Sequence, residues 1–245
     1  MTTTTHTKPN EEIISYQKLR LFIGIIGLAL PVLLVLGCFV LGAGNFSWQH
    51  SISHYYYSKM HIVFVGLLGL LGGFLITYKG KVKGESIAAN IAGWSAFGIA
   101  TFPTTYEGFK ADATSANQYL SLLNEVKPLW GDFHFGSATL LFICFILFCC
   151  KYFQKADEVY TTDIEIKKFG RRKKLYMACG IGIAISIAII ALFNFVVHID
   201  GGLFFYTTFI FETTALWCFG IAWLIKGSKA LKKIPVIKSM ISPLR

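Results

Sequence analysis

The chain has 245 residues, of which 54% are hydrophobic and only 15% are charged, and its formal net charge is +10. Soluble domains carry about 25% charged residues, so this composition argues against an ordinary soluble protein. The basic residues lie between long apolar runs, which is typical of membrane topology signals and of contacts with anionic lipid. This distribution argues against nucleic-acid binding.

Six apolar runs predict an all-α, polytopic bundle of six transmembrane helices, because about 20 apolar residues cross a bilayer core of about 30 Å. In chain order, the expected spans are residues 21–43, 60–78, 87–102, 133–153, 175–197 and 203–225. The transmembrane domain is then residues 21–226. It is preceded by a cytoplasmic segment, residues 1–20, and followed by a basic cytoplasmic tail, residues 227–245.

The basic residues predict the orientation of this bundle, because cytoplasmic connections are enriched in Lys and Arg. Of the 23 basic residues, 20 fall in the N-terminal segment, the second and fourth connections and the C-terminal tail. The opposite side would hold only Lys59, Lys110 and Lys127. We therefore expect both termini in the cytoplasm.

The six cysteines all lie within apolar runs, and none shows a CxxC spacing. They are Cys38, Cys144, Cys149, Cys150, Cys179 and Cys218. This pattern predicts small packing residues, and it disfavours a disulfide framework or a zinc–thiolate site.

Histidine is concentrated in the half of the bundle opposite the termini. This half contains His50, His54, His61, His134 and His198, together with the acids Glu107, Asp132 and Asp200. His134 and Ser137 are three residues apart and share a helix face, and Asn194 and His198, four apart, share another. If these faces point inward, the side chains line one outward-facing polar pocket.

Neutral imidazole binds zinc, copper or haem iron, so His61, His134 and His198 are candidate metal ligands, although no particular cofactor is predicted. The alternative is that these histidines only anchor the protein at the membrane interface, where amphipathic side chains are common. The same choice applies to Tyr55, Tyr56 and Tyr57, which follow His54: they either anchor the chain at the lipid surface or form the lid of a cavity.

Glu212 lies near the middle of the sixth run, where a carboxylate costs about 2.5–3.5 kcal/mol on membrane-insertion scales. We expect it to face the bundle interior, with Thr208 one turn away. Asn90, Trp94 and Ser95 of the third run are further candidate partners. Such an acid is either a functional group or part of a buried structural hydrogen bond.

Several short motifs resemble those of a group of six-helix bacterial membrane proteins without a settled activity. They are Ser51–Tyr57, Val63–Gly66, Thr77–Gly80, Phe102–Thr104, Phe211–Thr213 and Phe219–Gly227. This group is similar in layout to the DRAM/Frag-type family, in which an Ile-Ser segment likewise follows the first span. The resemblance implies a six-helix fold and a location in the bacterial inner membrane.

A second resemblance is to the CREST hydrolases, which hold zinc with three histidines and an aspartate beside a serine. Asp132, His134, Ser137 and His198 look superficially similar. That family has seven spans and an HxxxH pair in the last one, whereas the last run of this chain contains no histidine.

The leading hypothesis is a protein without enzymatic activity that binds a small molecule or a lipid headgroup in the outward-facing pocket. One alternative is a metal-dependent hydrolase or a haem or quinone redox protein. Another is a proton-coupled carrier that uses Glu212.

Overall fold

The computed structural model describes residues 9–41, 48–105, 128–155, 161–194 and 206–231, and these ranges are helical without a β-strand. The long helices are α1 (Pro9–Leu41), α2 (His61–Thr77), α3 (Glu85–Thr101), α4 (Pro128–Leu147), α5 (Asp163–Leu192) and α6 (Thr207–Leu231). A 3-10 helix, η1 (Ser53–Tyr57), precedes α2, and a π-helical turn, η3 (Phe148–Tyr152), continues α4. The predicted all-α class is confirmed for the described residues.

Four segments are long and apolar enough to cross a membrane. They are Tyr16–Leu41, Leu129–Tyr152, Asp163–Leu192 and Thr207–Ser228. α2 is a shorter apolar helix of 17 residues, and α3 has the same length, which is the lower limit of the usual range for a membrane-spanning helix. The fold is therefore that of a membrane protein.

Two helices begin well before the apolar runs that predict them. α1 begins at Pro9 and α5 at Asp163, each 12 residues earlier than the expected span. A helix needs no apolar residues to form its backbone hydrogen bonds, and Thr162 caps α5 by accepting a hydrogen bond from the Glu165 N–H at 3.3 Å. The hydropathy pattern marks apolar stretches, whereas these helices continue into polar sequence.

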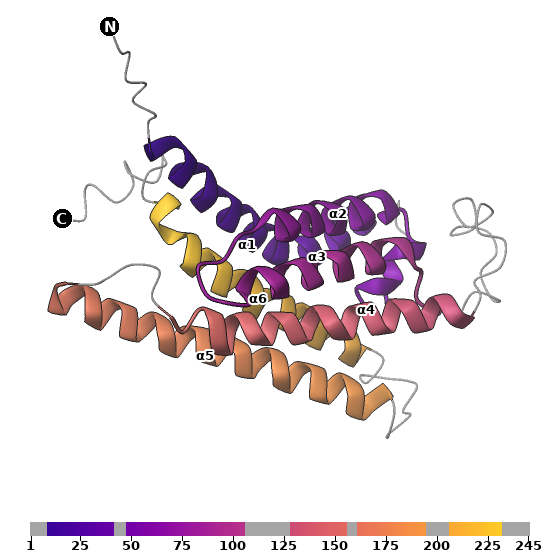
Figure 1. The fold of residues 1–245 in the computed structure, drawn as a ribbon. Helices are drawn as coiled ribbons and strands as arrows, with labels where there is room; N and C mark the ends of the chain where they lie inside the picture. Colours follow the sequence, from indigo (N-terminus) through magenta and orange to yellow (C-terminus); the bar gives the residue numbers. More distant parts are fainter. Residues whose placement is uncertain (1–8, 42–47, 106–127, 156–160, 195–205, 232–245) are drawn as a thin grey trace, which may run out of the picture.

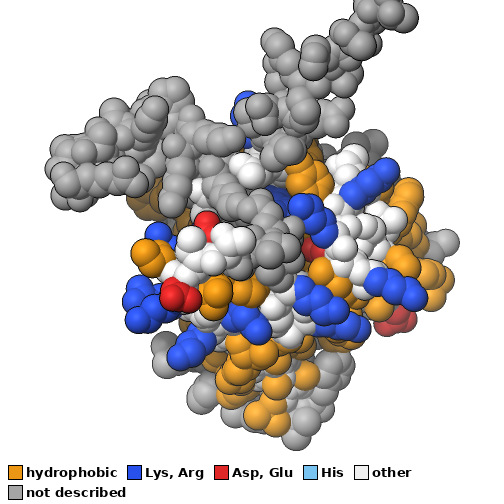
Figure 2. Space-filling view, turned by 60° about the vertical axis from the view of Figure 1, so that its left-hand side comes forward, with side chains coloured by type: hydrophobic (Ala, Val, Ile, Leu, Met, Phe, Trp, Pro, Cys, Tyr) orange, Lys and Arg blue, Asp and Glu red, His pale blue; other side chains and the backbone are white. Residues whose placement is uncertain are grey.

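The helices form a closed ring in chain order, because each packs against the next one along the chain and α6 packs against α1. Figure 1 shows that α1 begins and α6 ends at the same end of the bundle. Figure 2, which brings this end forward, shows Lys and Arg side chains spread over it. We call it the basic end, and the opposite end, which η1 covers, the cap end.

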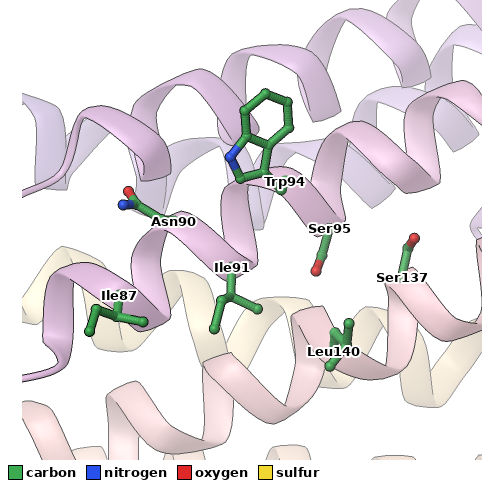
Figure 3. Close-up of a pocket in the computed structure, with 7 residues that line it drawn as sticks. All are labelled: Ile87, Asn90, Ile91, Trp94, Ser95, Ser137 and Leu140. Carbon is green, nitrogen blue, oxygen red and sulfur yellow. The ribbon is translucent and has the colours of Figure 1, made fainter.

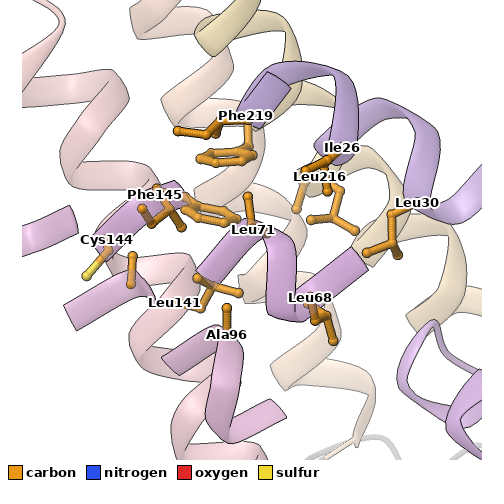
Figure 4. Packing of buried hydrophobic residues seen from close by; sticks show 14 of the residues in the cluster. Ile26, Leu30, Leu68, Leu71, Ala96, Leu141, Cys144, Phe145, Leu216 and Phe219 are labelled. Atoms are coloured by element: carbon orange, nitrogen blue, oxygen red, sulfur yellow. The ribbon is translucent and has the colours of Figure 1, made fainter. Parts of the chain in front are cut away.

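The centre of the ring is filled by apolar side chains, many of which Figure 4 shows. Phe145 of α4 stacks on Phe219 of α6 with ring centroids 3.5 Å apart and an interplanar angle of 14°. The labelled neighbours come from α1, α2, α3, α4 and α6, and include Leu30, Leu71 and Ala96. This packing closes the middle of the bundle.

Glycine allows two pairs of helices to approach very closely. A Cβ atom at Gly72 of α2 would lie 2.9 Å from the carbonyl oxygen of Gly93 on α3, and one at Gly93 would lie 2.7 Å from the oxygen of Gly72. α1 and α6 meet in the same way at Gly24 and Gly220. In lipid, helices associate through close packing and not through the hydrophobic effect, and small residues permit that packing. These contacts therefore set the distances between α2 and α3 and between α1 and α6.

Gly72→Ala should therefore destabilise the bundle, whereas Gly73→Ala should not, because a Cβ at Gly73 would meet no atom within 4 Å. Overpacking a close helix contact costs about 1–3 kcal/mol. The melting temperature of the purified protein in detergent measures the difference. Equal melting temperatures for the two variants would show that the α2–α3 distance does not depend on Gly72.

Candidate functional site

A segment of residues 48–60, here called the cap segment, covers the cap end of the bundle and is bonded to α6. The backbone N–H of Phe209, in the first turn of α6, donates to the carbonyl oxygen of His50 at 3.0 Å. The N–H of Ile52 donates to Oε2 of Glu212 at 2.6 Å. Glu212 therefore holds the start of η1, and the acid predicted to be a buried functional or structural group serves here as a structural acceptor.

His134 joins three parts of the chain at the cap end. Its Nδ1 lies 2.6 Å from the carbonyl oxygen of Phe102, and its Nε2 lies 2.9 Å from Oγ of Ser53 in η1. A carbonyl oxygen only accepts, so Nδ1 carries the proton and Nε2 accepts from the Ser53 hydroxyl. The side chain is only 3% exposed, and both ring nitrogens are occupied.

The cap segment also bonds to the connection that follows α3. The Tyr57 hydroxyl donates to the carbonyl oxygen of Thr104, and burial raises the pKa of this tyrosine. Nδ1 of His54 lies 2.7 Å from Oγ of Ser51, and the imidazole also hydrogen-bonds the backbone of Thr105. Burial, with a smaller contribution from neighbouring His50, lowers the pKa of His54 to about 4, so His54 is neutral at physiological pH.

The tyrosine triplet is buried beneath the cap and does not project as a surface anchor. Tyr55 is fully buried, and Tyr56 and Tyr57 are each less than 8% exposed. Burial raises the pKa of Tyr55 to about 12. Of the two interpretations left open by the sequence, burial favours the lid.

The two candidate metal ligands that the structure describes, His61 and His134, hydrogen-bond to different groups of the chain. Nδ1 of His61 lies 2.6 Å from the carbonyl oxygen of Tyr56, and its ring meets the Tyr56 ring edge-on at 4.3 Å between centroids. His134 bonds to other partners. No group of three His, Cys, Asp or Glu side chains within the described ranges is placed to hold a metal ion. His198, Asp200 and Glu107 lie outside the described residues.

The remaining predicted residues lie in three separate places. Asp132 is exposed at the start of α4. Nδ2 of Asn194 donates to Oγ1 of Thr208 at 3.2 Å, which links α5 to α6. Thr208 therefore contacts Asn194, while the bonded partner of Glu212 is the cap backbone. Asn90, Trp94 and Ser95, which the sequence offered as partners of Glu212, lie on another seam.

That seam is a groove of about 410 Å³ between α3 and α4. It is lined by Ile87, Asn90, Ile91, Trp94, Ser95, Ser137 and Leu140. Figure 3 shows Ser95 of α3 and Ser137 of α4 on the facing sides of the two helices, with Asn90 farther along α3. Asn90 and Trp94 are exposed on the outside of the bundle, where a membrane protein meets lipid. His134 and Ser137 both face α3, as their spacing predicts.

The basic end holds a buried polar network that the sequence patterns do not predict. The Tyr78 hydroxyl accepts from Nη2 of Arg20 at 3.2 Å and donates to Oε1 of Glu85 at 2.7 Å. Glu85 has no exposed surface, and its Oε2 accepts from the Val82 N–H at 3.2 Å. A side chain at Gly80 would overlap Glu85, so this turn requires glycine. The available signal was that Glu85 is the one acid in a connection with three lysines.

Aromatic rings complete this network. The Arg20 guanidinium lies 4.9 Å from the centroid of the Tyr16 ring, and Tyr16 stacks on Tyr78 at 5.4 Å. The edge of Trp223 meets Tyr78 at 4.8 Å. The network therefore joins α1, α3 and α6 through Tyr78, the residue that follows α2, and it gives Arg20 a structural role.

Comparison with known proteins adds no assignment, since no protein-family profile, no curated protein and no solved structure matches this chain.

Glu212→Leu should free the cap segment, whereas Glu212→Gln should not, because the amide oxygen of Gln can still accept the hydrogen bond from Ile52. An unpaired buried donor costs about 1–3 kcal/mol. Hydrogen–deuterium exchange of peptides covering residues 48–60 should be faster in Glu212→Leu than in the wild-type protein or in Glu212→Gln. Unchanged protection in Glu212→Leu would mean that this bond does not hold the cap.

Proposed function

We propose that the protein binds a small amphiphile from the bilayer in the groove between α3 and α4. The proposal is carried by Asn90, Ser95 and Ser137, whose side chains have no hydrogen-bond partner within the described ranges although they line a seam on the outside of a membrane bundle. Most hydrogen-bonding groups in lipid are satisfied within the protein, because each unsatisfied group there is costly. A bound molecule that carries carbonyl or hydroxyl groups would supply the missing partners.

The volume and the lining of the groove fit such a ligand. A volume of about 410 Å³ is within the range of 300–1,000 Å³ typical of small-molecule sites. Asn90 is five residues into α3, which places it about 8 Å along the helix from Glu85. Ile87, Ile91 and Leu140 supply apolar walls for a hydrocarbon portion, while Asn90, Ser95 and Ser137 offer hydrogen-bonding groups at different points along the groove.

This proposal moves the ligand from the outward-facing pocket expected from the sequence to the side of the bundle. At the cap end, His54, His134 and Glu212 make hydrogen bonds to other groups of the chain itself. Among the predicted pocket residues that the structure describes, Ser137 alone lines the groove. The expected class of ligand, a small molecule or part of a lipid, is retained.

We further propose that the chain crosses the bacterial inner membrane six times, with both termini in the cytoplasm. The distribution of 20 of the 23 basic residues supports this orientation, as does the common end at which α1 begins and α6 ends. In this arrangement α2 and α3, each of 17 residues, also span. The resemblance to six-helix bacterial membrane proteins of the DRAM/Frag layout supports the same count and location.

The triple variant Asn90→Leu, Ser95→Ala, Ser137→Ala should lose a copurified amphiphile that the wild-type protein retains. We expect occupancy to fall about tenfold or more, which corresponds to about 1.4 kcal/mol of binding free energy. Native mass spectrometry of the protein released from detergent, with extraction and identification of the bound molecule, measures the occupancy.

Thr139→Ala is the matched control, because Thr139 is an exposed residue of α4 outside the groove whose hydroxyl bonds the carbonyl oxygen of Phe135. It should keep the wild-type occupancy. Identical bound molecules in the triple variant and the control would contradict the proposal. A change of the triple variant from dimer to monomer at unchanged lipid content would instead identify the groove as a contact between copies.

A further inference from the structure

Four of the six cysteines come together where α4, α5 and α6 meet. Two lie in η3, one on α5 and one on α6: Cys149, Cys150, Cys179 and Cys218. They are 29 to 69 residues apart between elements, so their convergence is a property of the fold and cannot be read from a local spacing. The sequence predicted packing residues at all four positions.

Cys179 and Cys218 lie on the facing sides of the seam between α5 and α6. Gly182 lies three residues beyond Cys179 on the same face of α5, and a Cβ there would lie 2.9 Å from Sγ of Cys218. The missing side chain at position 182 leaves the space in which the Cys218 thiol lies beside Cys179.

The two thiols differ in access. Cys179 is buried, whereas Cys218 is half-buried. A small molecule dissolved in the membrane therefore reaches Cys218 first, and the buried thiol remains reduced beside it. An accessible cysteine next to a second thiol is the arrangement in which a sulfenic acid is converted to a disulfide before it oxidises further.

We propose that Cys218 and Cys179 form a reversible redox pair that is oxidised by a hydroperoxide. Sγ of Cys218 attacks one peroxide oxygen and the O–O bond breaks, which gives a sulfenic acid on Cys218 and one molecule of water or alcohol. Sγ of Cys179 then attacks the sulfur of Cys218, and the hydroxyl group leaves as water with the proton of the Cys179 thiol. The two thiols lose two electrons, and the peroxide gains them.

The product joins α5 to α6 covalently. Reduction by a dithiol reverses the reaction through thiol–disulfide exchange and restores both thiols. The disulfide would add a covalent link between two helices that also meet through packing and the Asn194–Thr208 hydrogen bond.

The full-length protein in lipid nanodiscs, treated with hydrogen peroxide and then with an alkylating reagent, tests the proposal. We expect two of the six cysteines to escape alkylation, and peptide mass spectrometry of the wild-type protein to identify one linked pair that contains Cys179 and Cys218. Dithiothreitol should restore six alkylated residues. This measurement requires no variant, so it does not depend on how well a substituted protein folds.

Cys179→Ser and Cys218→Ser should each abolish the link, while Cys38→Ser and Cys144→Ser, in other parts of the bundle, should retain it. Cys149→Ser should also retain it, although this buried thiol lies close to both partners. The proposal is overturned if peroxide leaves all six thiols free, if Cys218 accumulates as sulfinic acid without a cross-link, or if the linked peptide contains Cys149 or Cys150.

Discussion

The hydrocarbon core of a bilayer offers no hydrogen bonds, so the polar side chains that a membrane bundle retains there need partners within the chain or in a bound molecule. The structure meets this constraint at both ends. At the cap end, Glu212 and His134 bind the backbone and a hydroxyl of the cap segment. At the basic end, the Tyr78 hydroxyl connects Arg20 to Glu85. Between these ends the centre of the ring is mostly apolar, and the groove between α3 and α4 holds three polar side chains, Asn90, Ser95 and Ser137, without hydrogen-bond partners in the described ranges.

The helices were predictable from the sequence because long apolar runs have one stable form in a bilayer, where backbone groups must bond within the segment. The first residues of α1 and α5 were not predictable, because the mostly polar segments Pro9–Arg20 and Asp163–Lys174 are not part of an apolar run. Thr162 and Glu165 do form a capping pattern, so the start of α5 could have been found from local chemistry. The order of the helices around the ring depends on contacts such as Gly72–Gly93, which no periodicity reveals.

The candidate site was predictable only at the level of single helices. The shared face of His134 and Ser137 follows from their spacing, and both residues do face α3. The partner of Glu212 is 160 residues away in the sequence and is a backbone N–H, which has no residue-type signature. The contact of Arg20 with Tyr78 could not be predicted for a related reason. An arginine at the edge of an apolar run normally indicates topology. The burial of Arg20 depends on Tyr78, which follows α2 and is 58 residues away in the sequence.

The proposed topology requires the cap end and the basic end to face opposite sides of the membrane. Cysteine substitutions at two exposed residues, Thr105 near the cap and Thr161 near the basic end, test this directly when intact bacterial cells are treated with a membrane-impermeant thiol reagent. The account predicts that Thr105→Cys is labelled in intact cells and that Thr161→Cys is labelled only after the membrane is permeabilised. Labelling of Thr161→Cys in intact cells, or equal labelling of both variants, would contradict it.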